Sequence, residues 1–181
     1  MADQITITVP ANATSIATLI AQWKQIPLDT PCAPQCGRFL SPAEMTAYLL
    51  ACMTDEDTVA GQLLACVLLS GIPPLDLLGA EWDVYDGVTG KIELVCNEEC
   101  IYKTFTLSRP AMDFLRKLRG HFPYFNHVFH RDAAPLLLDE VIDAFERITV
   151  RAEMPMLSIE DVVLSYQYIA FNTALFGADV I

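Results

Sequence analysis

Residues 68–95 read LLSGIPPLDLLGAEWDVYDGVTGKIELV, and this stretch predicts the order of elements in the chain. An apolar helix ends just before Pro73-Pro74, which breaks the chain, and about one more helical turn follows over 75–78. We then expect a strand over 81–85, a turn, and a second strand over 91–96. The segment therefore predicts a helical protein that changes to a β-meander after a kink.

Helical patterns flank this segment on both sides. Ser41-Pro42-Ala43-Glu44 predicts a helix start, because a capping serine precedes proline at the first helical position and a glutamate that reaches back. The segment 59–69 is apolar nearly all round, which predicts a central helix. The remaining expected elements are a third strand over 101–107, a helix from Ser108 to Gly120, an aromatic, histidine-containing connector over 122–131, and helices beginning at Asp139 and Ser158. The predicted fold class is therefore mainly α (α+β), with a small three-stranded antiparallel sheet.

The chain divides into an arm, residues 1–38, and a main domain, residues 39–181. In the arm we expect a short strand over 5–9, a helix over 15–25 and a proline-rich loop before the main domain. The expected helix carries four apolar side chains on one face, namely Ile16, Leu19, Ile20 and Trp23.

Composition predicts a globular protein that does not cross a membrane. Of the residues, 53% are hydrophobic and 19% are charged, which is typical of a folded domain. No apolar run reaches the roughly 18 residues that a membrane span requires. The N-terminus lacks the basic region of a signal peptide, so we expect a cytoplasmic protein with reduced thiols.

The net charge of −12 is unevenly distributed along the chain. Residues 51–100 hold ten acidic side chains and one basic side chain, Lys91. A second stretch, 109–131, holds the candidate DNA-binding cations Arg109, Arg116, Lys117, Arg119 and Arg131. Because phosphate neutralisation supplies most of the affinity for DNA, the acidic chain predicts weak DNA binding at most and favours a protein partner.

Two C-x-x-x-C pairs are weak candidates for a metal site. Cys32 and Cys36 form one pair, and Cys96 and Cys100 form the other, so that together they could supply four thiolates to zinc. The spacing is less typical than C-x-x-C, and free cysteine is common in protein cores. We therefore expect neither a bound metal nor a cofactor.

The order of elements and several local motifs resemble the catalytic domain of tyrosine recombinases, the phage integrase family, over roughly residues 39–181. The family's first catalytic box commonly reads T-G-x-R-x-x-E-x-x-x-L-x-W-x-D, and residues 70–82 here read SGIPPLDLLGAEW. The residues that fit are Gly71, Asp76, Leu77, Leu78 and Trp82. Weaker similarities follow the meander at 106–115 and again at 127–129. The resemblance implies the family's helical fold and a relation to enzymes that break and rejoin DNA.

The positions that the family uses for catalysis hold other residues in this chain. The resemblance implies an arginine that clamps the scissile phosphate, but Pro73 stands there and has neither charge nor donor. The hairpin lysine that protonates the leaving oxygen falls near Glu98. The family's second box, H-x-x-R-H, can be matched in two registers, which place either Glu160 and Val163 or Val163, Tyr166 and Gln167 at its key positions. The chain also ends at Ile181, before the expected place of the nucleophilic tyrosine.

These observations predict a catalytically inactive recombinase-like protein that acts by binding, in a process related to DNA recombination on a mobile element. In one version the acidic surface binds a protein, such as a basic DNA-binding protein. In another, the 109–131 stretch keeps weak, salt-sensitive contact with DNA. A third reading, a small enzyme with an unrecognised site, has no motif behind it and predicts a pocket with clustered titratable groups.

Overall fold

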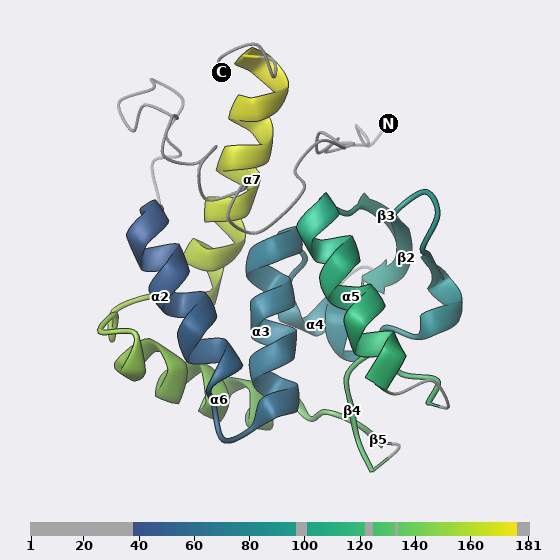
Figure 1. The fold of residues 1–181 in the computed structure, drawn as a ribbon, viewed down its shortest axis with the longest axis horizontal. Coiled ribbons are helices and arrows are strands. Elements are labelled where there is room, and N and C mark those ends of the chain that lie inside the picture. The colour runs from purple at the N-terminus through teal and green to yellow at the C-terminus, as the bar shows by residue number, and fades with distance from the viewer. Residues whose placement is uncertain (1–37, 97–100, 122–124, 133, 177–181) are drawn as a thin grey trace.

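The computed structural model describes residues 38–96, 101–121, 125–132 and 134–176. The arm predicted for residues 1–38 therefore lies outside the described residues except for Arg38, as do Glu98, Cys32, Cys36 and Cys100. The helices are α2 (Pro42–Met53), α3 (Thr58–Ser70), α4 (Pro74–Leu78), α5 (Arg109–His121), α6 (Leu138–Arg151) and α7 (Ile159–Phe176), with a 3-10 turn, η1 (Trp82–Val84). The strands are β1 (Tyr85–Asp86), β2 (Lys91–Cys96), β3 (Ile101–Thr106), β4 (His130–Arg131) and β5 (Ala134–Pro135). Figure 1 shows helices around α3, with the sheet beside α5.

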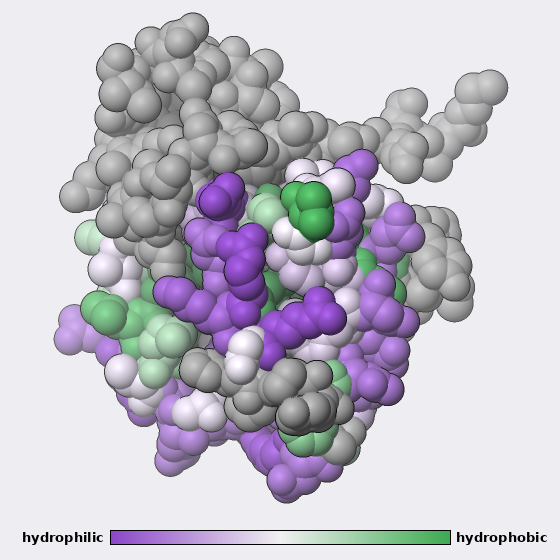
Figure 2. Space-filling model, turned by 45° about the vertical axis from the view of Figure 1, so that its right-hand side comes forward, coloured by the Kyte–Doolittle hydropathy of each residue, from purple (hydrophilic) through white to green (hydrophobic). Residues whose placement is uncertain are grey.

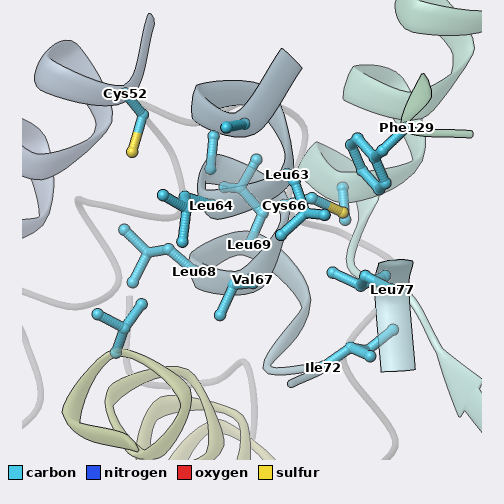
Figure 3. Packing of buried hydrophobic residues seen from close by; sticks show 14 of the residues in the cluster. Cys52, Leu63, Leu64, Cys66, Val67, Leu68, Leu69, Ile72, Leu77 and Phe129 are labelled. Atoms are coloured by element: carbon cyan, nitrogen blue, oxygen red, sulfur yellow. The ribbon is translucent and has the colours of Figure 1, made fainter. Parts of the chain in front are cut away.

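Helix α3 forms the centre of the core, as its apolar sequence predicted. Every residue from Leu63 to Ser70 is buried, and α2, α5, α6 and α7 all pack against this helix. Figure 3 shows apolar side chains leaving α3 in several directions, and Leu77 of α4 and Phe129 lie among their neighbours. Each such side chain contributes about 1.5–3 kcal/mol when it is fully buried, so α3 is the element on which the others assemble.

The predicted helix caps are present. Ser41 and Glu44 form a capping box at α2, in which the Ser41 N–H donates to the Glu44 carboxylate at 2.8 Å. The hydroxyls of Ser108 and Ser158 accept N–H groups in the first turns of α5 and α7 at 3.2 and 3.1 Å. Helix α3 is capped by Asp57, whose carboxylate accepts the Ala60 N–H at 3.1 Å.

The three-stranded sheet is antiparallel in the order β1-β2-β3, with Lys91 opposite Thr106 and Cys96 opposite Ile101. Ile92 and Leu94 of β2 are buried, whereas Lys91 and Glu93 are exposed. This alternation places one face of the sheet on the core. The predicted fold class is confirmed.

The segment predicted as a strand over 81–85 is instead η1 followed by the two-residue strand β1. The reason is a partner distant in sequence, because the Trp82 N–H donates to the Asn126 carbonyl at 2.8 Å and the Val128 N–H donates to the Ala80 carbonyl at 2.9 Å. The connector therefore takes up the Trp82 N–H, which the prediction assigned to the sheet.

Two smaller features also differ from or add to the prediction. Helix α5 does not end at Gly120 but continues to His121. The aromatic connector ends in strand β4 of the small antiparallel pair β4–β5, with His130 opposite Pro135, and this pair was not predicted from the sequence. No helix among the described residues is long and apolar enough to span a bilayer.

Candidate functional site

The candidate site is the turn between α3 and α4, where the sequence places Pro73. Gly71 ends α3 with a positive φ of 67° and donates its N–H to the Val67 carbonyl at 2.8 Å. Pro73 is half-buried and precedes the first residue of α4, where its carbonyl accepts the N–H of Asp76 at 3.1 Å. No lysine, arginine or histidine occurs from residue 70 to residue 78. This turn therefore brings no cation of its own to the surface.

Tyr166 of α7 packs directly against this turn. A Cβ built on Gly71 would lie 2.4 Å from Cδ1 of the Tyr166 ring, so glycine is required for the contact. Burial raises the pKa of the Tyr166 phenol well above its usual value, and the nearby Ser108 hydroxyl only partly opposes this. Tyr166 is therefore a protonated core residue at neutral pH and is not activated as a nucleophile.

Ser108 joins three helices at the same place. Its hydroxyl donates to the Leu69 carbonyl at the end of α3 at 2.9 Å, and it also accepts the Ala111 N–H of α5. Because Tyr166 of α7 lies beside it, the end of α3, the start of α5 and the middle of α7 are fixed relative to one another.

The other α7 positions implied by the resemblance carry no positive charge. Glu160 is exposed in the first turn, and Val163 and Gln167 are half-buried, with Val163 packed against the core. Both registers of the second box therefore place neutral or acidic side chains on this part of α7.

Asp161, which neither register assigned a role, anchors the chain that leads into α2. Its carboxylate accepts the Arg38 N–H at 2.8 Å and the Ser158 N–H at 3.0 Å. Burial raises the pKa of Asp161, but these hydrogen bonds outweigh it and hold the pKa below its ordinary value. The Ser165 hydroxyl of α7 also accepts the Leu40 N–H at 2.9 Å.

The five candidate DNA-binding cations differ in their neighbours. Asp113 is close to two cations of α5, Arg116 at 2.6 Å and Arg109 at 3.8 Å. Lys117 is exposed, and the Arg119 guanidinium lies 5.6 Å from the centre of the Trp82 ring.

Arg131 is on β4 and forms ion pairs with Asp57 and Glu140. Three of the five candidate cations, Arg109, Arg116 and Arg131, therefore lie beside acidic side chains. Figure 2 brings the α5 and sheet side of Figure 1 forward, and hydrophilic side chains cover most of its described surface.

A charged cluster that the sequence did not predict joins the α2–α3 connection to α6. The Asp55 side chain is fully buried, and its carboxylate accepts a hydrogen bond from Arg147 at 2.8 Å, with Arg151 at 3.8 Å. Glu56 lies 3.3 Å from Arg147, and Asp57 pairs with Arg131. Three acids of the 51–100 stretch are thus neutralised by arginines far along the chain. The four-residue spacing of Arg147 and Arg151 on one helix face was the only sign of this in the sequence.

Burial and hydrogen bonding act against each other at Asp55. Burial raises its pKa, but the hydrogen bonds from Arg147 and from the Asp57 N–H, with the charges of Arg147 and Arg151, bring the pKa below its ordinary value. Asp55 is therefore ionised at neutral pH and acts as a structural anion.

The histidines and thiols of the described residues do not form a reactive group. His127 Nδ1 lies 3.8 Å from the Glu81 carboxylate, and the ring centres of His130 and Phe125 are 4.1 Å apart. Burial, followed by the neighbouring His127, lowers the pKa of His130, so this ring is neutral at pH 7. Burial raises the pKa of the Cys66 thiol to about 12.

Within the ranges that the structure describes, no three His, Cys, Asp or Glu side chains are grouped so that they could hold a metal. This does not test the four-thiolate candidate, because three of its cysteines lie outside those ranges and the side chain of Cys96 is not described.

Comparison with known proteins identifies the fold. No family model matches the chain, and no curated protein matches it. Solved structures do match, among them XerA recombinase, with a TM-score of 0.63 and 13% identity over 91% of this chain and 61% of that one. A lambda integrase dimer bound to a COC' core site matches with a TM-score of 0.60 and 10% identity, over 83% of this chain and 59% of that one. The Tn1549 transposon integrase in complex with circular intermediate DNA matches with a TM-score of 0.58 and 13% identity, over 84% of this chain and 57% of that one.

These structures are tyrosine recombinases and integrases, and this chain spans about three fifths of their length. At such low identity the likeness establishes the fold alone. The chain has the fold of a tyrosine recombinase catalytic domain, as the order of its elements and motifs implied.

Proposed function

We propose that this chain is a catalytically inactive, recombinase-like protein that takes part in DNA recombination by binding, as a regulatory module, and not by cutting DNA. The observation that carries the proposal is Pro73 at the α3–α4 turn. In the family that the chain resembles, a fixed cation at this place stabilises the charge that develops on the phosphate. Proline carries no charge that could stabilise the phosphate and has no N–H that could donate a hydrogen bond.

The neighbouring positions support the same proposal. Glu160, Val163 and Gln167 of α7 offer no permanent positive charge, and the Tyr166 phenol packs on Gly71. Removing one oxyanion-stabilising donor from an enzyme typically costs about 10²–10³ in rate. We therefore expect no strand cleavage from a site that lacks several of them.

The distribution of charge favours a protein partner over DNA. The net charge is −12, and Arg109, Arg116 and Arg131 all have acidic side chains beside them. Tight binding to the DNA backbone needs several phosphate contacts from unneutralised cations. We propose a partner with a basic surface, such as another DNA-binding protein of the same mobile element. A cytoplasmic location fits this role and stays a prediction.

Residual DNA binding through α5 is the second candidate. Lys117 and Arg119 are exposed on the same helix, and two such cations would give weak contact that falls steeply with salt. Measuring how DNA retention changes as the salt concentration rises therefore tests this second candidate.

The test uses the purified chain with supercoiled plasmid, with linear duplex DNA at several salt concentrations, and with an active recombinase that has a basic DNA-binding face. We expect no nicking, loss of DNA retention before about 150 mM salt, and measurable binding to the basic protein. The double variant Lys117→Glu/Arg119→Glu should abolish any DNA retention at low salt. Lys91→Glu, which makes the same kind of charge change on β2, should affect it much less.

Two results would contradict the proposal. A plasmid-nicking activity that co-purifies with the chain would show that the site is active. Tight duplex binding that persists near physiological salt would replace the protein partner with DNA.

A further inference from the structure

Helix α6 presents a row of acidic side chains on its outer face. Asp139, Asp143 and Glu146 are exposed, and their spacing of four and three residues places them along one face of the helix. No ion pair within the described ranges involves any of these three carboxylates. The face therefore displays three unneutralised negative charges over about 10 Å of helix.

The arginines of α6 lie on the neighbouring side of the helix and are already paired. Arg147 and Arg151 approach the buried Asp55 carboxylate at 2.8 and 3.8 Å. The ion-pair cluster on that side contains three arginines and four acids, namely Arg131, Arg147, Arg151, Asp55, Glu56, Asp57 and Glu140. The cluster therefore has no net positive charge that could cancel the acidic row.

Large apolar side chains accompany this acidic row. Val150 continues the face toward the end of α6 and is 66% exposed, and Ile142, at the edge of the face, is 40% exposed. Ten large apolar side chains of the described residues are exposed, and five of them lie in α6 or within five residues of its ends, namely Leu137, Leu138, Ile142, Val150 and Met156. Exposed apolar side chains gathered within a polar rim are typical of a surface that binds a protein.

The described elements pack against the opposite side of α6. Val141, Phe145 and Ile148 are buried on that side, where α6 packs against α2, α3 and α4. Figure 1 shows α6 at the lower edge of the described helices, apart from the three-stranded sheet. No described element covers the acidic row.

We propose that the outer face of α6 binds a basic amphipathic helix of the partner protein, whose cations contact the three carboxylates and whose apolar stripe covers Ile142 and Val150. The inference rests on the proposed function and names the surface that the basic partner contacts. Charge complementarity selects this occupant, because unneutralised acids attract a basic segment and repel duplex DNA. With 14 residues, α6 is about 21 Å long and can align with a partner helix of similar length.

A labelled synthetic peptide tests the proposal by fluorescence anisotropy. The peptide is a helix with lysines on both sides of a leucine stripe, and a peptide with glutamine in place of each lysine is its control. We expect saturable binding of the lysine peptide to the full chain at about 50 mM salt, with an affinity that falls as the salt concentration rises. The glutamine peptide should not bind.

Two double charge reversals locate the site. Asp143→Lys/Glu146→Lys should weaken peptide binding by at least about tenfold, because two attractions become repulsions. Asp83→Lys/Glu93→Lys makes the same change of net charge at exposed positions of η1 and β2, and it should weaken binding by less than about threefold. Circular dichroism checks that both variants fold. Equal weakening by the two variants would overturn the α6 site.

The apolar contact and the place of binding are measured separately. Val150→Ser should weaken binding by about threefold to tenfold, whereas Val88→Ser, at a valine that is 92% exposed on the β1–β2 turn, should leave it unchanged. A carbodiimide joins lysine amines to carboxylates that they contact. Cross-links mapped by mass spectrometry should therefore include Asp143 and Glu146, and cross-links found only outside α6 would contradict the proposal.

The basic recombinase used to test the proposed function separates that function from this inference. If the recombinase binds the wild type and Asp143→Lys/Glu146→Lys equally, the protein-partner function stands and the α6 site is wrong. If neither the recombinase nor the peptide binds the wild type, both are wrong. A dimer of the chain that the same double variant converts to monomer would also overturn the inference, because a second copy would then occupy α6.

Discussion

Gly71 shows how one residue sets the geometry of the candidate site. Its backbone is in the left-handed region, at φ 67°, where an L side chain costs about 1–2 kcal/mol. The Tyr166 ring also occupies the space that a Cβ would need. The turn that places Pro73 at the start of α4 thus depends on a glycine for two independent reasons.

We predict that Gly71→Ala lowers the free energy of unfolding by about 2–4 kcal/mol, because backbone strain and the clash with Tyr166 add. Gly79→Ala is the matched control. It caps the next helix at φ −92°, with nothing within 4 Å of the new Cβ, so it should be neutral or stabilise by up to about 1 kcal/mol. Urea denaturation measures both, and equal effects would contradict this account of Gly71.

At the scale of elements, Ser108 connects helices that the sequence could only place in order. One hydroxyl serves as the cap of α5 and as the donor to the last turn of α3. The serine is fully buried, so water cannot replace its hydroxyl as the partner of the Leu69 carbonyl or of the Ala111 N–H. The relative placement of α3, α5 and α7 around the candidate site depends on this residue and on the Tyr166 ring beside it.

Ser108→Ala should therefore cost more than the loss of an ordinary cap. We expect about 2–3 kcal/mol, because the variant loses a cap and leaves the buried Leu69 carbonyl without this donor. Ser41→Ala removes only the cap of α2 and should cost about 1 kcal/mol. Denaturation midpoints at an unchanged m-value give the comparison, and a smaller loss for Ser108→Ala than for Ser41→Ala would count against the connecting role.

At the scale of the whole molecule, acidic and basic stretches far apart in sequence partly neutralise each other. Asp55, Glu56 and Asp57 pair with arginines of β4 and α6, so the connection between α2 and α3 is held to the second half of the chain. The remaining acidic surface is smaller than the sequence suggests, and so is the basic surface proposed for DNA.

Asp55→Asn should lower the free energy of unfolding by about 1–3 kcal/mol at neutral pH, because the buried ion pair with Arg147 is lost. The folded-state pKa of Asp55 is below its ordinary value, so its contribution is present above about pH 4 and is lost as the pH falls through the folded pKa. The difference between wild type and variant should therefore shrink near about pH 3.

Glu56→Gln provides the control for this pair. Glu56 is 77% exposed and also contacts Arg147, and an exposed ion pair contributes about 0–1 kcal/mol. Denaturant unfolding at both pH values measures the two variants. A difference for Asp55→Asn that stays constant down to pH 3 would show that charge is not the source of its effect.

The sequence by itself determined the features that depend on neighbouring residues, namely helix starts, the central helix and the strands of the sheet. The capping serines fixed the starts of α2, α5 and α7, and the uniform apolar run made α3 central. The predicted bounds of β2 agree with the structure, and those of β3 agree to within one residue. The family resemblance rested on such local motifs and located Pro73 correctly between α3 and α4. These signals could be read because each acts over a few residues.

Only the tertiary structure decided the features that depend on residues far apart in the chain. Trp82 begins η1 and not a strand because its N–H donates to the Asn126 carbonyl, and Arg131 pairs with Asp57 and Glu140, which are distant in sequence. Tyr166 becomes a core residue because it lies on Gly71. Hydrogen bonding, ion pairing and packing depend on distance in space, and a linear pattern contains that distance only for near neighbours.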